Sequence, residues 1–322
     1  MRKRTGYSLL VVLILLSALG VVLYLRQKAP PEPARLLPES DAIVFVDLKP
    51  LRLATHFDAT PVTRSPSYQQ FIDATGIVVE RDLDSAAFAL HRMADPKGPN
   101  GVVAFSEVVT GRFDTVRLTR YLQTIANNQE SYAGHIIYAI PSEGRTLRVT
   151  QLDYDTLAAS NMPTPEQIHS ILDRSRAAAS PFAGSSLLSA RFNDVPAFSS
   201  AWAIGHIGLP FSENNRITVL GLELPLPADT TFVASLRFRG ALLLRIDQVA
   251  PTELAAAQSV QSITGLLALF RSMQLAQQPV PRTPEEIALR QFSDSIKIDQ
   301  HKDRATLTAT LPSETLKHLT TP

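Results

Sequence analysis

The chain has 322 residues, of which 45% are hydrophobic and 19% are charged, and its formal net charge is +1. This composition is typical of globular proteins with one large or two modest domains and excludes a largely disordered chain. No cysteine is present, which excludes a disulfide framework and a lipid-modified N-terminal cysteine. Residues 29–322 contain 26 basic and 30 acidic residues, and this acidic excess argues against nucleic-acid binding.

The N-terminus predicts a membrane anchor, because residues 7–25 form a run of nineteen positions without a charge. As a helix this run is about 28 Å long, close to the ~30 Å hydrocarbon core of a bilayer. Basic residues flank the run on both sides, three before it and two just after it. This favours a cytoplasmic stub at residues 1–6, a single transmembrane helix at 7–25 and a periplasmic location for the bulk of the chain. The expected location is thus the bacterial inner membrane.

A cleaved signal peptide is the alternative interpretation of the same segment. The apolar core of a signal peptide has about 7 to 15 residues and ends in a small-x-small cleavage site. Here the apolar run continues past Ala18 and Gly20 to Leu25. We therefore expect the anchor to remain attached.

Residues 26–40 are rich in proline and predict an extended polyproline II spacer between membrane and folded region. The first strand is expected at Ala42–Leu48. It is entered by the sequence Leu-Pro-Glu-Ser-Asp-Ala and left by Asp-Leu-x-x-Leu-Arg. These edges, together with the C-terminal third, resemble single-span bacterial envelope proteins that open their outer domain with the same pattern. The resemblance implies no activity and no functional residues.

The region after the spacer predicts an α+β fold, because strands come in hairpins with helices between the pairs. The order hairpin, helix, hairpin occurs in residues 84–151 and again in 231–311. We interpret this as two related antiparallel units, the first over 41–215 and the second over 216–322. Pro210, Pro225 and Pro227 mark the predicted boundary.

Several helices have clear sequence signals at their ends. Gly76 is expected to end a helix over Ser67–Thr75, and Asp114 to cap the next one. Capping boxes with proline at the first helical position are predicted at Thr164 and Thr283. The long helix predicted over 252–276 has an apolar stripe for core packing, one edge of which offers a surface for a partner helix.

Recognised catalytic and metal-binding motifs are missing from the sequence. The seven histidines are scattered, and no Gly-x-Ser-x-Gly, Ser-x-x-Lys or phosphate-binding glycine loop occurs. Asp153 and Asp155 are interpreted as turn residues between two strands. The sequence therefore predicts no catalytic residue, no metal ligand and no cofactor, although an active site dispersed along the chain remains an alternative.

Two pairs of residues are candidates for binding a ligand or a partner. Arg237 and Arg239 lie two apart on a predicted strand and so share one face, where two guanidinium groups suit an anionic partner group. Trp202 and His206 share one face of the predicted strand 201–207 and suit the lining of a pocket. Each pair has a structural alternative, a solvated sheet face for the arginines and a core or rim position for the other two.

The sequence as a whole predicts an anchored envelope protein whose outer region binds a partner, most plainly another protein of the envelope, without catalysis. Binding of a lipid or small molecule and a hydrolase with a dispersed site are the alternatives. The two binding alternatives require different surfaces: a lipid needs an enclosed apolar cavity, and a protein needs an exposed patch. The oligomeric state is not indicated.

Overall fold

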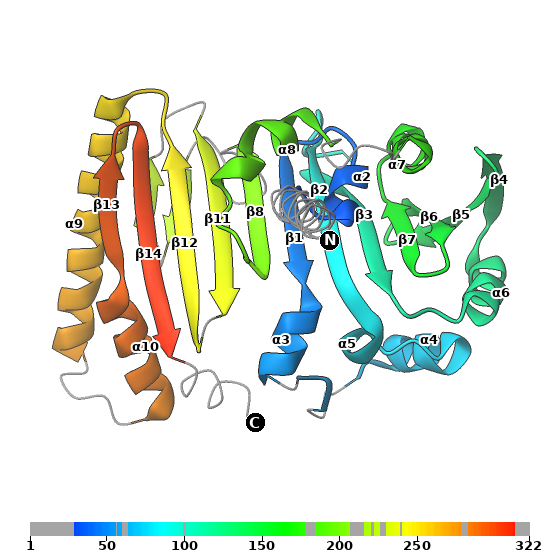
Figure 1. The fold of residues 1–322 in the computed structure, drawn as a ribbon, viewed down its shortest axis with the longest axis horizontal. Coiled ribbons are helices and arrows are strands. Elements are labelled where there is room, and N and C mark those ends of the chain that lie inside the picture. The colour runs from blue at the N-terminus through cyan, green and yellow to red at the C-terminus, as the bar shows by residue number, and fades with distance from the viewer. Residues whose placement is uncertain are drawn as a thin grey trace, which may run out of the picture.

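The structure is a computed structural model and describes residues 29–55, 57–59, 64–98, 101–177, 184–206, 216–219, 222–225, 230–238, 240–277 and 283–312. The fold is α+β, built on one antiparallel sheet of twelve strands (Figure 1). The strand order is β13-β14-β12-β11-β8-β1-β2-β3-β7-β6-β5-β4. The strands are β1 (Ala42–Asp47), β2 (Leu83–Arg92), β3 (Val103–Gly111), β4 (Asn128–Tyr132), β5 (His135–Ser142), β6 (Arg145–Asp153), β7 (Thr156–Ser160), β8 (Ala201–His206), β11 (Thr231–Phe238), β12 (Ala241–Val249), β13 (Lys297–His301) and β14 (Arg304–Pro312). A separate hairpin pairs β9 (Arg216–Val219) with β10 (Leu222–Pro225).

Helices cover different parts of the two sheet faces. The described helices are α2 (Glu32–Leu36), α3 (Leu48–Thr55), α4 (Pro66–Thr75), α5 (Val79–Asp82), α6 (Thr115–Ile125), α7 (Glu166–Arg176), α8 (Ser186–Arg191), α9 (Glu253–Gln277) and α10 (Pro284–Ser295), with short 3-10 turns at Phe57–Ala59 and Phe192–Asp194. On one face, here called the α8 face, α2 and α8 pack over the central strands, α7 packs over β6 and β7, and the three helices close the main core. In Figure 1, α2 and α8 lie over the middle of the sheet, α9 lies at one end and α6 at the other.

The main core takes one side chain of every two along the central strands. Ile43 of β1, Ala89 of β2 and Ile204 of β8 are buried on the α8 face, and their strand neighbours point the other way. Trp202 belongs to the same core and stacks on Phe45, with ring centroids 5.5 Å apart. A second, smaller core lies on the opposite face, where α6 packs against β5.

The predicted division into two antiparallel units is wrong, because the sheet continues without interruption from one segment into the other. β8 hydrogen-bonds to β1 on one side and to β11 on the other, so residues 84–151 and 231–311 contribute to one sheet. The hairpins themselves were correctly predicted: β2 pairs with β3, β11 with β12, and β13 with β14. Sequence periodicity detects adjacent strands but carries no information on pairing between distant ones, and this is why the error arose.

The transmembrane helix predicted over residues 7–25 lies outside the described residues. Within the described residues, no helix has the length and hydropathy needed to cross a membrane. The anchor and the inner-membrane location therefore stay predictions.

The end of the predicted spacer is folded rather than extended. Residues 32–36 form α2, and Ala34 and Leu37 have no exposed surface. Pro31 precedes the helix and Pro33 lies in its first turn, where the missing N–H of proline has no helical partner to lose. Burial of the apolar side chains against the sheet outweighs the extended preference of a proline-rich segment.

Most predicted helix ends are confirmed. Gly76 ends α4 with φ 74°, Asp114 accepts hydrogen bonds from two backbone amides of α6, and Thr283 forms a complete capping box with Glu286. The capping box predicted at Thr164 is wrong, since α7 begins one residue later with Pro165 at its N-cap and no side-chain cap.

We expect Leu37→Ala to destabilise the protein by about 2 to 5 kcal/mol, because it empties a filled site in the main core. The matched control is Leu53→Ala, since Leu53 is 77% exposed and its truncation should change stability by less than about 0.5 kcal/mol. Urea unfolding followed by circular dichroism measures both. Equal effects would contradict the assignment of residues 32–37 to the core.

Candidate functional site

The sheet face opposite α8 is apolar over the central strands, although no described helix packs mainly on its middle. Along β1, β3 and β8 the residues on the α8 face are buried, while those on the opposite face are partly exposed. An antiparallel sheet with one open face normally places polar residues on it. Over the middle of β1, β2, β3, β8 and β11 these positions, called the Glu107 face, are Val44, Val46, Phe88, Leu90, Phe105, Glu107, Val109, Ala203, Phe232, Ala234 and Leu236, and the exposed Arg92 lies on the same side at the end of β2.

The strand register places these side chains in continuous rows across the sheet. One row connects twelve strands through directly paired residues, namely Gln129, Tyr138, Val149, Ala159, Glu107, Phe88, Val44, Ala203, Ala234, Ile246, Leu307 and Ile298. Glu107 is the single charged residue of this row. Paired residues of an antiparallel sheet point to the same side, so the carboxyl group of Glu107 stands among apolar neighbours.

The described helices on this side pack mainly at the two ends of the sheet. On this side of the sheet, α6 packs against β5, whereas α9 and α10 pack against β13 and β14. α3 reaches β2 and β11 at one end of the strands, and β10 contacts α9. The distance from β11 to β3 is four strand spacings, about 19 Å. This is close to twice the ~10 Å diameter of a single helix.

Glu107 has no partner among the described residues. No hydrogen bond or ion pair is formed by its carboxylate there, and burial raises the pKa of the Glu107 carboxyl above its ordinary value. Its cross-strand neighbours are Phe88 on β2 and Ala159 on β7. A carboxylate in such surroundings costs free energy in the folded state, because water is partly removed and nothing replaces it.

A histidine and two serines form a hydrogen-bonded chain on the α8 face. The ring of His91 lies 3.0 Å from the hydroxyl of Ser106, and that hydroxyl lies 3.0 Å from the hydroxyl of Ser160. All three side chains are buried, and burial lowers the pKa of His91 against the charge of Asp41. Because Ser106 has no exposed surface, a substrate has no access to its hydroxyl. The chain satisfies polar groups within the sheet rather than forming a nucleophile.

A second histidine meets a carboxylate at the far end of the sheet. His169 of α7 lies 2.8 Å from a carboxylate oxygen of Glu130 on β4. Its ring stacks on Tyr132 with centroids 3.8 Å apart, and the Tyr132 hydroxyl donates to Asp173. β4 is the last strand of the sheet, so these contacts attach an edge strand to the helix beside it.

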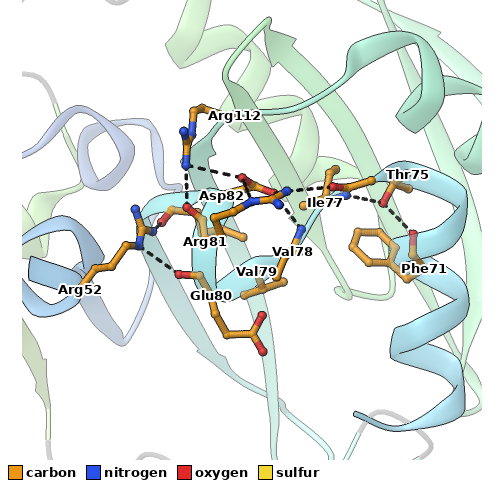
Figure 2. A network of polar contacts seen from close by, with 12 residues as sticks. Arg52, Phe71, Thr75, Ile77, Val78, Val79, Glu80, Arg81, Asp82 and Arg112 are labelled. Carbon is orange, nitrogen blue, oxygen red and sulfur yellow. Dashed lines mark hydrogen bonds and ion pairs between the residues drawn. The ribbon is translucent and has the colours of Figure 1, made fainter. Parts of the chain in front are cut away.

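A network of arginines and aspartates lies where the chain enters β2. Figure 2 shows Asp82 between Arg81 and Arg112, at 2.6 Å and 3.6 Å. Arg52 of α3 donates to the backbone carbonyls of Glu80 and Leu83 in the same turn. Burial by itself would raise the pKa of Asp82, but hydrogen bonds from Arg81 and the amide of Val78, with the charge of Arg112, hold that pKa below its ordinary value. The network joins α3, α5 and the β2–β3 pair, and its cations already have acceptors.

An open hollow of about 670 Å³ lies between α6 and the β6–β7 turn. Its lining includes Thr115, Arg120, Gln123 and Tyr154, and the side chain of Tyr154 is 71% exposed. The hollow is shallow and bears mixed polar and apolar atoms. It is not the enclosed apolar cavity that a lipid requires.

The residues predicted from sequence do not come together in one site. Trp202 lies in the main core, and His206 is exposed at the end of β8, where its ring lies 3.3 Å from the Thr231 hydroxyl. Arg237 is partly exposed on the α8 side of β11, away from the Glu107 face. Arg239 lies outside the described residues. Binding by these four residues stays a prediction.

Sequence reasoning missed Glu107, although a signal for it exists. In β3, Val-Ala-Phe-Ser-Glu-Val-Val, a strongly acidic residue interrupts a strand that is otherwise apolar or small. Such a run fits a strand buried on both faces, in which a carboxylate is unexpected. Only the pairing of β3 with β2 and β7 shows what surrounds it.

These features define an α+β protein with one long antiparallel sheet and a candidate docking surface on it. No family model and no curated protein matches the chain. Among solved structures it is similar to TP0453. Crystal form III of TP0453 aligns with a TM-score of 0.48 and 13% identity, covering 90% of this chain and 97% of that one, and crystal form I aligns with 0.46 and 13%, covering 91% and 97%. At these values no function is transferred.

We expect Asp82→Asn to lower stability at pH 7 by about 1 to 3 kcal/mol, because the amide cannot pair with two guanidinium groups. The folded-state pKa of Asp82 is lowered, so its stabilisation is present above the unfolded value near 3.9 and is lost as pH falls through the folded value. The difference from wild type should therefore shrink in acid. Thermal melts between pH 3 and 7 test this, with Asp58→Asn on the exposed 3-10 turn as control.

Glu107→Gln should have the opposite effect and stabilise the isolated protein at neutral pH by about 1 to 3 kcal/mol, since it removes an unpaired, partly buried charge. The folded-state pKa of Glu107 is raised, so the wild type is most stable below the unfolded value near 4.3 and loses stability as pH rises through the folded value. The gain should vanish near pH 4 and below. A variant less stable than wild type at pH 7 would show that the carboxylate has a partner.

Proposed function

We propose that this chain is a membrane-anchored protein of the bacterial envelope whose outer α+β region binds another protein through the Glu107 face, without catalysis. The single observation that carries the proposal is an apolar sheet face that no described helix covers in its middle. The apolar residues of this face are partly exposed, and contiguous apolar surface that remains accessible is characteristic of interaction sites.

A protein fits the shape of this surface better than a single lipid. The face is about 19 Å wide from β11 to β3 and its apolar residues are partly exposed, whereas a lipid chain gains most from a closed apolar cavity. Burying such a face against a helix pair or a sheet removes all its apolar side chains from water at once, at about 25 cal/mol for each Å². A protein partner therefore gains more on this face than one acyl chain does.

The polar clusters support binding rather than catalysis. The His91–Ser106 contact is sealed in the core, and the His169–Glu130 contact attaches an edge strand to α7. Each of these two contacts therefore has a structural role in the fold. The apolar run at residues 7–25, if it anchors the chain, restricts partners to proteins of the same layer and raises their effective concentration.

Photocrosslinking in intact cells tests the proposal. A photoreactive phenylalanine analogue replaces Phe88 on the Glu107 face or, as the matched control, Phe198, which is 69% exposed near the start of β8. We expect one defined protein adduct from position 88 and at most a diffuse background from position 198.

Substitution of Val44 by aspartate should abolish the adduct from position 88, because it places a second carboxylate in the middle of the face. The purified variant must keep the wild-type circular dichroism spectrum, since Val44 is only partly buried. Equal adducts from positions 88 and 198, or an adduct at 88 that persists with Val44→Asp, would refute binding through this face.

A further inference from the structure

We propose that the protein bound by the Glu107 face presents one lysine or arginine within an otherwise apolar surface, and that this cation pairs with the Glu107 carboxylate. The inference rests on the proposed function, namely that a protein covers this face. It adds the chemistry by which the face distinguishes its partner from other apolar surfaces.

The first argument is the cost of covering an unpaired carboxylate. Glu107 stands between Phe88 and Ala159 in its row, with Val44 and Val149 one strand further on each side. Glu107 is partly exposed, and burial already disfavours its charged form. A purely apolar partner would bury the carboxylate further and leave its charge without a donor, which is strongly unfavourable. A partner that brings a cation avoids this cost.

The second argument is the setting of the carboxylate. Phe88 lies directly opposite Glu107 on β2, and Phe105 lies two residues before it on the same face of β3. Aromatic rings favour a nearby ammonium or guanidinium group, and the long stems of lysine and arginine pack well on apolar surface. The surroundings of Glu107 thus suit the head and the stem of one such side chain. Because Glu107 is the one charge in the middle of this face, the middle is complementary to a partner surface that bears one opposite charge.

The third argument excludes a symmetric pair of this chain as the favoured occupant. A two-fold contact uses the same patch on both copies. Two copies meeting with Glu107 near the axis would face two carboxylates toward each other, and the described cation nearest along β2 on this side, Arg92, lies at the end of the strand, four residues beyond Phe88. Like charges facing each other in an apolar contact weaken it. A different protein with a basic residue is the better complement.

The residue also carries a cost that packing does not explain. Glutamine has nearly the same shape as glutamate and would spare the folded protein an unpaired charge. Residues that lower stability without a structural return are characteristic of functional sites. For Glu107 we infer that the functional gain is an ion pair with the partner's cation in the complex.

The test compares four full-length chains that carry the photoreactive analogue at position 88. They have wild-type Glu107, Glu107→Gln, Glu107→Lys, or the control Glu253→Gln at the exposed start of α9. We expect the adduct to fall about tenfold with Glu107→Gln and further with Glu107→Lys, as for other close charge pairs across an interface. The control should match wild type. Since Glu107→Gln is expected to stabilise the free chain, a lost adduct cannot be ascribed to unfolding.

A charge exchange then identifies the partner residue. Mass spectrometry of the wild-type adduct maps the partner segment attached at position 88, in which we expect one lysine or arginine among apolar residues. Replacing that residue by glutamate should weaken the adduct with wild-type Glu107 and restore it with Glu107→Lys. Rescue of this kind requires direct pairing of the two charges.

Three results would overturn the inference while leaving binding through the face intact. These are an undiminished adduct with Glu107→Gln, a mapped segment without a basic residue, and failure of the charge exchange. An adduct to a second copy, to lipid or to residues 7–25 of the same chain would also overturn it. Absence of any adduct from the wild-type chain would instead refute the proposed function itself.

Discussion

The pairing of β1 with β8 is the contact on which the rest of the structure depends. These strands lie far apart in the sequence, yet their hydrogen bonds join the two halves of the twelve-stranded sheet. This β1–β8 pairing is called the seam. At Gly205 the seam has no room for a side chain, since a Cβ there would lie 2.7 Å from the Cβ of Ala42. Above the seam, Phe45 and Trp202 stack in the main core. The seam therefore sets both the core on one face and the continuity of the Glu107 face on the other.

Over the central strands, the two faces of the sheet differ in what covers them. On the α8 face, α2, α7 and α8 bury the apolar side chains within the chain itself. On the other face, the described helices stand at the two ends, against β5 and against β13 and β14. The middle between them is a partly exposed apolar surface with Glu107 in it. An energetic preference for covering this surface follows from the area itself, and the carboxylate determines what kind of surface covers it at least cost.

Local features were predictable where a short sequence contains the whole cause. Asp114 caps α6 and Thr283 caps α10 because the side chain and the amides it accepts from lie within three residues of each other. Gly76 ends α4 because a left-handed conformation there suits glycine. Pro165 shows the limit, because a fitting Thr-Pro-Glu-Gln sequence was placed differently by the surrounding chain. Of the candidate residues, Trp202 proved to belong to the core, and the carboxylate of greatest interest was not among the candidates.

The sequence by itself determined the α+β class, the hairpins and most helix ends, since each depends on periodicity or on capping between near neighbours. It also contained the apolar run at residues 7–25 and the glutamate in β3. Only the tertiary structure decided that all twelve main strands form one sheet, that residues 32–37 belong to the core, and that Glu107 stands in an apolar row. The physical reason is that strand pairing brings together residues from distant parts of the chain. The environment of a side chain on a sheet comes mainly from those distant neighbours.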